Sequence, residues 1–448
     1  MKRLIFKVAA MASLFLFAGA IGSVMANGQK EGAAGGGNVK IRFATQWQAG
    51  STTGDAPIAV PILEKWAKDH PNVQLVQEVS VGDEMRNTIR TDVAANNAPD
   101  IWQFWAGGVL NDYAREGILL DMSKYLAVSK VVKKSDIPEF AWKTTTVDGV
   151  IRALPRNVAL GAFFANRELF QKYGLQYPKT WSEFLADGKI FREHGVIPTN
   201  IGSKGGNPSH FWYNDLVCQY TSGNPAIENL QTSLSFQDPA FLKAAQYSDQ
   251  MRKAGMFPDD VVANGDWAPS IALYDQGNVA MGYTFPWDYA EMPADIVAKT
   301  DIIPIPKLPD GQRDPATFIQ GTVNDAYCVY AKSFADVAKQ PVLTSLLDTI
   351  DKDIGFALAQ AGNMVSIDQE VMSRVDTSKI PNAMMVKAIQ YQNKTHESGS
   401  PMIWASLPSN KTQFDYQSGL DELWTGAATP TQFIAKVQKS LDDYKASR

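Results

Sequence analysis

The amino-acid sequence predicts an α/β protein whose strands and helices alternate along the chain. In the first part of the chain, apolar residues recur with the period of a strand and then with that of a helix, and this pattern repeats. The 448 residues are 45% hydrophobic and 20% charged, a globular composition long enough for roughly two or three domains. Successive strand–helix units of this length predict a parallel sheet with helices on both faces.

Three strand–helix units follow one another in the first quarter of the chain. The expected elements are a strand at 39–43, a helix at 58–66, a strand at 73–79, a helix at 85–93, a strand at 100–102 and a helix at 109–116. Ligands of such sheets bind outside the carboxyl ends of the strands. We therefore expect residues 45–48, 81–84 and 103–107 to form one wall of a site.

The remaining chain continues the alternation with clear helix signals. Thr180 and Glu183 form a capping box that opens one helix, and Thr429 with Gln432 opens the last one. The expected elements are a strand at 158–165, helices at 180–194 and 238–254, strands at 279–283, 302–305 and 327–330, and a final helix from 429. No internal repeat of fixed period is present, so a solenoid is excluded.

Residues 1–26 predict a secretory signal peptide. A basic start is followed by an apolar run at residues 8–21 and by small residues before a cleavage site at Ala26. Residues 27–38 are rich in Gly and Ala and predict a flexible tether. Because no cysteine near the cleavage site could carry a lipid, we expect a soluble protein in the periplasm of a bacterium with an outer membrane.

Charge and motifs exclude several functional classes. Lys and Arg number 42 against 47 Asp and Glu, a net charge of -5, so we expect no basic surface for nucleic acid. The sequence lacks the nucleophile-elbow, zinc-protease, phosphate-loop and dinucleotide motifs, and its four histidines are widely separated. We therefore expect no metal, no cofactor and no catalytic residue.

Tryptophan is the most informative residue type in this sequence. The chain has 11 Trp, and many stand near Gly, Pro or Asn in expected loops. These are Trp47, Trp102, Trp105, Trp212, Trp267, Trp287 and Trp404. A Trp in a loop buries its ring in a local core or against a ligand, and the C–H faces of sugars stack well on such rings. The group favours a carbohydrate site, whereas Trp66 and Trp181 lie in helix patterns and are expected in the core.

Four motifs, in order along the chain, resemble one protein family. They are Pro99-Asp100-Ile101 with Phe104-Trp105-Ala106; Ala153-Leu154-Pro155 with Thr180-Trp181-Ser182-Glu183-Phe184; Gln276-Gly277-Asn278-Val279-Ala280-Met281-Gly282 with Trp287; and Ile303-Pro304-Ile305-Pro306 with Gln320-Gly321. Behind a predicted signal peptide, they resemble the maltose-binding-protein-like bacterial extracellular solute-binding proteins of ABC sugar importers, solute-binding family 1. Phe285-Pro286 departs from the pattern, which usually has Gly before the Trp.

The resemblance implies a two-lobed periplasmic-binding-protein fold in which the chain crosses a hinge three times. The expected crossings lie near 158–161, 303–305 and 349–353. The first lobe would comprise residues 39–158 plus 305–350, and the second 159–304 plus 351–448. Cys218 and Cys328 would fall in different lobes, and we expect both to be free, buried thiols.

The resemblance also implies a function. The protein would be a receptor, not an enzyme, that captures a carbohydrate between its lobes and delivers it, as a monomer, to the permease subunits of an ABC importer in the inner membrane. The candidate ligand-binding residues are Gln46, Trp47, Asp83, Glu84, Trp105, Arg156, Asn157, Trp212, Trp267, Trp287, Asp288, Gln320, Asn363 and Trp404.

Other functions remain open from the sequence. The same fold binds glycerol-3-phosphate and other small solutes, although an anion demands cationic groups and only Arg156 is clearly placed in the candidate loops. A secreted glycosidase or lyase could use the same aromatic site if Asp55, Asp83 or Glu84 met Asp288 at the roughly 5–9.5 Å that glycosidic catalysis needs. Product formation from oligosaccharides would distinguish an enzyme from a receptor.

Overall fold

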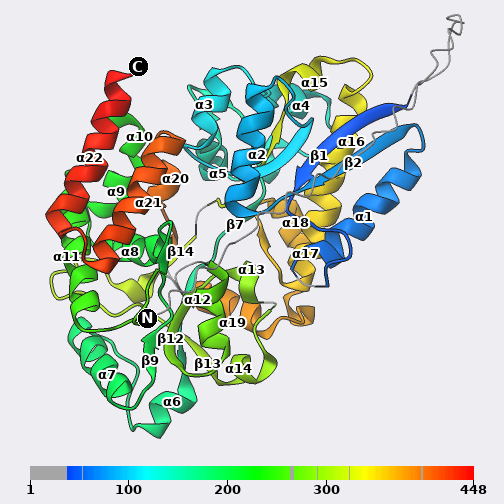
Figure 1. The fold of residues 1–448 in the computed structure, drawn as a ribbon. Coiled ribbons are helices and arrows are strands. Elements are labelled where there is room, and N and C mark those ends of the chain that lie inside the picture. Colours follow the sequence, from blue (N-terminus) through cyan, green and yellow to red (C-terminus); the bar gives the residue numbers. More distant parts are fainter. Residues whose placement is uncertain (1–37, 53, 263–266, 290, 322, 395–396) are drawn as a thin grey trace, which may run out of the picture. The chain divides into compact units, whose positions relative to one another are not determined.

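The computed structural model describes residues 38–52, 54–262, 267–289, 291–321, 323–394 and 397–448 (Figure 1). The predicted signal peptide, and all but the last residue of the predicted tether, lie outside these described residues. The described chain contains two main sheets, each with covering helices and its own core, which we call the first and second lobes. Within these ranges, no helix is both long and apolar enough to cross a bilayer.

The first lobe is built on a five-stranded sheet with the order β2-β1-β3-β15-β6. Its strands are β1 (Val39–Thr45), β2 (Val73–Val79), β3 (Ile101–Trp105), β6 (Ala153–Pro155) and β15 (Asp325–Val329). β1 pairs in parallel with β2 and β3, as predicted, but β15 runs antiparallel to β3 and β6. The sheet is therefore mixed rather than parallel, because β15 is entered from the second lobe and not through a covering helix.

Helices pack on both sides of this sheet through regularly spaced apolar residues. In α1, Ala59, Leu63 and Trp66 are buried at helical spacing, and Trp66 Nε1 donates to Ser345 Oγ at 3.1 Å. The helices of this lobe are α1 (Ala56–Asp69), α2 (Gly82–Ala94), α3 (Leu110–Arg115), α4 (Met122–Val128), α5 (Glu139–Thr144), α15 (Ala331–Ala335), α16 (Gln340–Thr349), a π-helical turn at Ile350–Ile354, α17 (Gly355–Ala361) and α18 (Gln369–Arg374). The predicted helices at 58–66, 85–93 and 109–116 are thus confirmed.

The second lobe is built on a four-stranded sheet with the order β13-β8-β12-β9. Its strands are β8 (Ala162–Asn166), β9 (Ile197–Thr199), β12 (Val279–Thr284) and β13 (Thr300–Ile303). Its helices include α6 (Arg167–Lys172), α7 (Trp181–Glu193), α8 (Ser209–Cys218), α11 (Pro239–Lys253), α12 (Trp267–Asp275), α13 (Pro286–Tyr289), α14 (Ala294–Lys299), α19 (Ala383–Gln392), α20 (Ile403–Ser406), α21 (Asn410–Thr425) and α22 (Pro430–Ala446). The predicted capping boxes at Thr180 and Thr429 are both present.

Adjacent residues of β8 face opposite sides of this sheet. Phe163 packs in the large core with Trp212 of α8, whereas Phe164 packs with Tyr274 of α12 in a smaller core that also contains α19 residues. Helices therefore cover both faces, as the alternating pattern predicts. Trp66 and Trp181 are core residues, and Cys218 and Cys328 are buried thiols in different lobes, as expected.

The chain passes between the two sheets three times. It does so between β6 and β8, between β13 and β15, and between α17 and α19. At the first passage, β7 (Asn157–Val158) pairs antiparallel with β16 (Val365–Ser366) of the third passage, and Val158 forms a bridge with Val323 of the second. The first crossing segment therefore pairs with both of the others.

The lobe boundaries stay a prediction, but the cores favour later second and third crossings than expected. Leu308 and Phe318 pack in the second-lobe core, beyond the expected crossing at 303–305. Ile354 and Leu358 pack in the first-lobe core, beyond the expected crossing at 349–353. The predicted strand at 158–165 is also divided, since residues 159–161 separate β7 from β8.

Arg156 links all three crossing segments. Its guanidinium donates to Asp325 at 2.9 Å and to Asp55 at 2.5 Å. Its carbonyl accepts from the amide of Ile367 at 3.1 Å, and its own amide donates to the carbonyl of Asp325 at 2.8 Å. Next to it, the side chain of Asn157 accepts from the amide of Asp325 at 3.1 Å. This buried network fixes the crossings relative to one another.

Replacement of Arg156 by Met should lower the free energy of unfolding by about 3–5 kcal/mol, because it leaves the buried carboxylate of Asp325 without its cationic partner. Urea unfolding followed by Trp fluorescence measures the loss. Lys65→Met is the control, because the Lys65–Asp69 pair is exposed and its removal should leave the curve unchanged. An Arg156→Met curve that coincides with the control curve would contradict the structural role of the network.

Candidate functional site

Four aromatic side chains of the second lobe form one connected group, which we call the aromatic cluster. Phe211 lies on α8, Trp267 opens α12, and Phe285 and Trp287 lie at the end of β12 and in α13. Phe285 stacks on Trp287 with ring centroids 4.6 Å apart, and Phe211 lies 4.3 Å from Phe285. Trp267 lies 5.6 Å from Phe211 and 5.7 Å from Trp287. Two of the predicted Trp residues therefore meet here.

The local sequence explains why part of this cluster is accessible. β12 ends at Thr284, and Pro286 opens α13, so Trp287 follows a rigid turn rather than a strand. Phe211 and Phe285 are buried, whereas Trp267 and Trp287 keep part of their surface exposed. The two buried rings thus support two indole rings that a ligand can reach.

Asp288 is the acidic group of this cluster. Its two carboxyl oxygens accept from Trp267 Nε1 at 3.0 and 3.1 Å, and one of them also accepts from the Thr284 hydroxyl. Burial raises the pKa of Asp288 to about 7. The hydrogen bonds from Thr284 and Trp267 oppose this rise, whereas the negative charges of Glu291 and Asp275 add to it. Asp288 therefore fixes the orientation of the Trp267 indole.

A second group connects the two lobes around Arg86. Arg86 lies on α2 and Trp105 ends β3, both in the first lobe, whereas Trp404 lies on α20 in the second-lobe core. The guanidinium carbon of Arg86 is 4.4 Å from the centroid of the Trp105 ring and 4.7 Å from that of Trp404. Trp105 packs against the cores of both lobes. These cation–π contacts therefore join the lobes.

His210 lies between the Arg86 group and the aromatic cluster. Its ring centroid is 3.8 Å from that of Phe211. Burial lowers the pKa of His210 to about 3, and the positive charge of Arg86 contributes to the lowering. A neutral imidazole presents one donor and one acceptor nitrogen. The two groups thus form a continuous set of aromatic and polar side chains drawn from both lobes.

Two buried nitrogen atoms in this set have no hydrogen-bond partner in the described part of the chain. They are His210 Nδ1 and Trp404 Nε1. Buried polar atoms are normally bonded to protein, water or a ligand, so each such atom needs an explanation. Each of these two nitrogen atoms is therefore a candidate to bond a polar group of a ligand or a water molecule.

Four other predicted site residues lie together at the crossings. Arg156 and Asn157 bond to the protein as described above, and Asn363 donates to the carbonyl of Gly54 at 2.9 Å. Trp47 is buried against Phe43, with the Arg156 guanidinium 5.6 Å from its ring centroid. Because the polar groups of Arg156 and Asn157 are occupied by protein partners, we assign these two residues to the hinge rather than to the ligand.

Trp212 is placed differently from the other predicted Trp residues. Its side chain is 1% exposed, its ring packs on Phe163 and Phe184, and its Nε1 lies 2.8 Å from Met251 Sδ. A ring enclosed on these sides has no face for a ligand, so the expectation that Trp212 binds ligand is wrong. The physical reason is the helical period, since one step along α8 turns a side chain by about 100°.

The remaining predicted residues are less defined. Gln46 is half-buried after β1, and Glu84 is exposed on α2. Asp83 lies on α2 and Gln320 in β14 (Phe318–Gln320), and the side chains of both lie outside the described residues. These four residues stay predictions.

Sequence reasoning missed Arg86, His210, Phe211 and Phe285. Arg86 follows Glu84 by two residues at the carboxyl end of the second strand, where the wall of a site was expected. Phe285 occupies the position where the family usually has Gly, a departure that could have signalled a changed site. His210 and Phe211 directly precede Trp212, but their orientation depends on how α8 packs on its sheet.

No metal centre emerges from the described ranges. Among these residues, no group of three or more His, Cys, Asp or Glu side chains could hold a metal ion.

A two-lobed α/β fold with three crossings, and aromatic side chains from both lobes around one site, defines a class of solute-binding proteins. The chain belongs to the bacterial extracellular solute-binding protein family, whose model matches residues 49–342. The family and fold expected from the four motifs are thereby confirmed.

Individual relatives agree with this assignment. The chain is 25% identical over 276 residues to a probable sugar-binding periplasmic protein of Rhizobium meliloti (strain 1021), covering 60% of this chain and 62% of the relative. The chain thus spans less than two thirds of the length of this curated relative. A solved structure from work on xylan utilization by Caldanaerobius polysaccharolyticus has a TM-score of 0.76 at 23% identity, covering 90% of this chain and 99% of the other. A chitin oligosaccharide binding protein has the same TM-score at 19% identity, covering 90% and 98%.

Replacement of Asp288 by Asn should flatten the pH dependence of stability. Because the folded protein holds a proton on Asp288 up to about pH 7 and the unfolded chain only to about pH 4, the Asp288 contribution to wild-type stability falls as the pH rises from 4 through 7 and then levels off. The substituted amide cannot ionise, so the variant should gain stability relative to the wild type over this interval. Melting temperatures from pH 4 to 9 measure the difference, and a difference that does not change with pH would contradict the raised pKa.

Proposed function

We propose that this protein is a periplasmic receptor that binds a neutral carbohydrate between its lobes and delivers it to the permease subunits of an ABC importer. The observation that carries this proposal is the set of aromatic rings drawn from both lobes, together with the unpartnered nitrogen atoms of His210 and Trp404 in the second lobe. The proposal includes export by the predicted signal peptide, action as a monomer, and the absence of catalytic turnover.

The chemistry of the site suits a sugar better than a flat or fully apolar ligand. A pyranose ring presents C–H groups on its faces and hydroxyl groups around its edge. The exposed parts of Trp267 and Trp287 can stack on the faces, while His210 and Trp404 can bond to hydroxyls. The names of the relatives point the same way, since they include a sugar-binding periplasmic protein and a chitin oligosaccharide binding protein.

Ligand capture would act through lobe closure. Trp105 and Arg86 belong to the first lobe, and Trp287 and Trp404 to the second, so a ligand touching both sets gains its full contact only when the lobes are together. Such a ligand shifts the population toward the closed state by its difference in affinity for the two states. A permease could then distinguish the ligand-bound protein from the free protein by the relative position of the lobes.

The alternatives are less well supported. The charge of Arg156, the cation considered for an anionic ligand, is taken up by Asp55 and Asp325. The guanidinium of Arg86, the cation found in the candidate site, lies over the rings of Trp105 and Trp404. Asp55 serves the same network, which removes one of the carboxylates considered for a glycosidase. The observed contacts therefore favour a receptor for a neutral ligand over an anion receptor and over a glycosidase.

A panel of monosaccharides, disaccharides and oligosaccharides tests the proposal by thermal shift. A ligand of the folded state raises the melting temperature by mass action, and the same sugar should reduce the radius of gyration in solution scattering. Incubation with the oligosaccharides, followed by product analysis, should show no turnover. Sugar hydrolysis would reject the receptor, and a panel without any shift would reject the carbohydrate.

Replacement of Trp287 by Ala should weaken sugar binding by about 1–3 kcal/mol with little change in the melting temperature of the unliganded protein, because its partly exposed ring is a stacking platform. Trp212→Ala is the matched control and should lose about 3–5 kcal/mol of folding stability, because that ring is enclosed in the core. Calorimetric titration and melting curves on both variants measure the contrast. A Trp287→Ala protein with low stability and normal affinity would place Trp287 in the core.

A further inference from the structure

Besides the crossing segments and the cation–π contacts, the two lobes touch along α3. Figure 1 shows α3 (cyan) of the first lobe beside α20 (orange) of the second. At this contact the amide of Gly108 donates to the carbonyl of Ala405 at 2.7 Å, and the side chain of Asn111 donates to the carbonyl of Pro408 at 3.0 Å. Ala405 belongs to the second-lobe core, whereas α3 packs in the first-lobe core. The contact therefore joins segments that belong to different lobes.

Two glycines allow the backbones of the lobes to come this close. A methyl group at Gly107 would overlap with the carbonyl oxygen of Ala405, and one at Gly108 would overlap with the carbonyl oxygen of Leu407. Both obstacles are backbone atoms, which cannot turn away as the end of a flexible side chain can. A residue with a side chain at Gly108 would therefore hold the two lobes apart.

The same surface of the first lobe also caps a helix of the second lobe. The carboxyl of Asp112, in the first turn of α3, accepts hydrogen bonds from the amide and from the side chain of Asn410. Asn410 is the first residue of α21, a helix of 16 residues, so its amide has no partner inside that helix. A carboxylate at a helix N-terminus also interacts favourably with the helix dipole. α21 therefore obtains part of its N-terminal cap from the other lobe.

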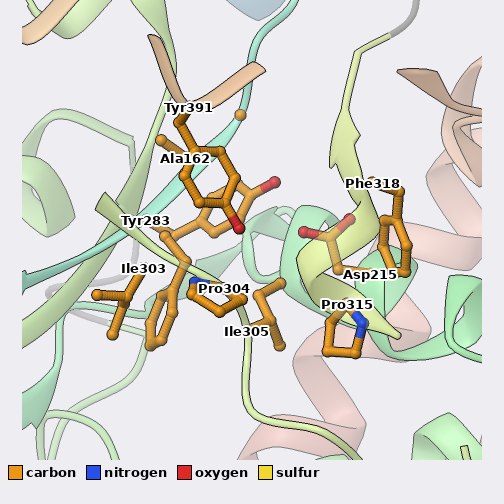
Figure 2. Close-up of a pocket in the computed structure, with 11 residues that line it drawn as sticks. Ala162, Asp215, Tyr283, Ile303, Pro304, Ile305, Pro315, Phe318 and Tyr391 are labelled. Atoms are coloured by element: carbon orange, nitrogen blue, oxygen red, sulfur yellow. The ribbon is translucent and has the colours of Figure 1, made fainter. Parts of the chain in front are cut away.

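The second-lobe ends of the crossing segments are closely packed. They surround a cavity of only about 20 Å³, whose wall includes Ala162 after the first crossing, Ile305 on the way to the second, and Tyr391 after the third (Figure 2). A cavity of this size holds no more than about one water molecule. The crossings thus form a compact pivot, and any change in the angle between the lobes must alter the lobe contacts outside them, including those of α3.

We propose that α3 and the two glycines before it form a latch that favours the closed state of the lobes in the free protein. Every contact of this latch is between protein atoms, so its free energy favours closure whether or not a ligand is bound. The latch raises the fraction of molecules that are ready to bind, and the apparent affinity rises with that fraction. This inference goes beyond the proposed function, because it does not depend on which solute the protein binds.

Two variants weaken the latch in different ways. Gly108→Ala places a methyl group against the Leu407 carbonyl and should act as a wedge between the lobes. Asp112→Ala removes the contact with Asn410 without adding an atom, so it tests the latch even if the wedge variant folds poorly.

Two control variants make the same changes inside a single lobe. Gly223→Ala brings a methyl group against the carbonyl oxygen of Val217, and both residues belong to the second lobe. Asp121→Ala removes the side chain that caps α4 within the first lobe. Each control should lower folding stability without changing the position of one lobe relative to the other.

Spin labels on Val337→Cys and Phe414→Cys report the lobe positions, because these exposed sites lie in different lobes and both native cysteines are fully buried. Double electron–electron resonance on the free wild type should show a population at the separation that corresponds to this structure. The ratio of this closed population to the open one should fall about 3- to 10-fold in Gly108→Ala and Asp112→Ala and stay unchanged in the controls. A free wild type without the closed population, or equal ratios in the wild type and both latch variants, would overturn the latch.

Sugar binding provides a separate measurement. With a sugar that binds, both latch variants should have a higher Kd, by up to the same factor, and the controls an unchanged Kd. A Kd that stays unchanged while the closed population falls would overturn the role of the latch in affinity. A panel in which no sugar binds would reject the proposed function, whereas the populations of the free protein would still decide whether the latch exists.

Discussion

The buried Arg156 side chain is the interaction on which the arrangement of the two lobes depends. It binds the carboxylates of Asp55, directly before α1, and of Asp325, at the start of β15, and its backbone bonds to the third crossing segment. Removing a guanidinium from water is costly unless carboxylates in good geometry replace the water. Arg156 therefore connects three segments that are distant in sequence. Its contacts fix where these segments lie between the two sheets.

The candidate site is made of side chains from both lobes, so its composition depends on this arrangement. The second lobe supplies stacked rings whose inner members are buried and whose outer members are accessible. The first lobe supplies Arg86 and Trp105, and the contact of Arg86 with Trp404 brings the two sets together. Polar atoms without partners in the described residues, at His210 and Trp404, belong to this set of side chains. Apolar faces with a few unsatisfied polar atoms suit a ligand that is itself apolar on its faces and polar at its edge.

Much of the fold could be predicted because its signals are local. The capping box at Thr180, the amphipathic spacing that ends at Trp66 and the alternation in the first strand each depend on residues within one or two turns. Predictions failed where a distant segment intervened. β15 turned the parallel sheet into a mixed one, and residues 159–161 interrupt the expected strand at a point where Gly161 lies against Tyr283 of β12 and the following Phe285.

The sequence by itself determined the α/β class and the family, because periodicity and motif order are properties of the chain alone. Only the tertiary structure decided which side chains lie together at the candidate site. Trp212 and Phe211 are neighbours on one helix, yet one is enclosed in the core and the other joins the aromatic cluster. Arg156 and Asn363 bond to the hinge, whereas Arg86 reaches two Trp rings. The reason is that side-chain direction is set by how each helix and crossing segment packs, and that packing depends on residues hundreds of positions away.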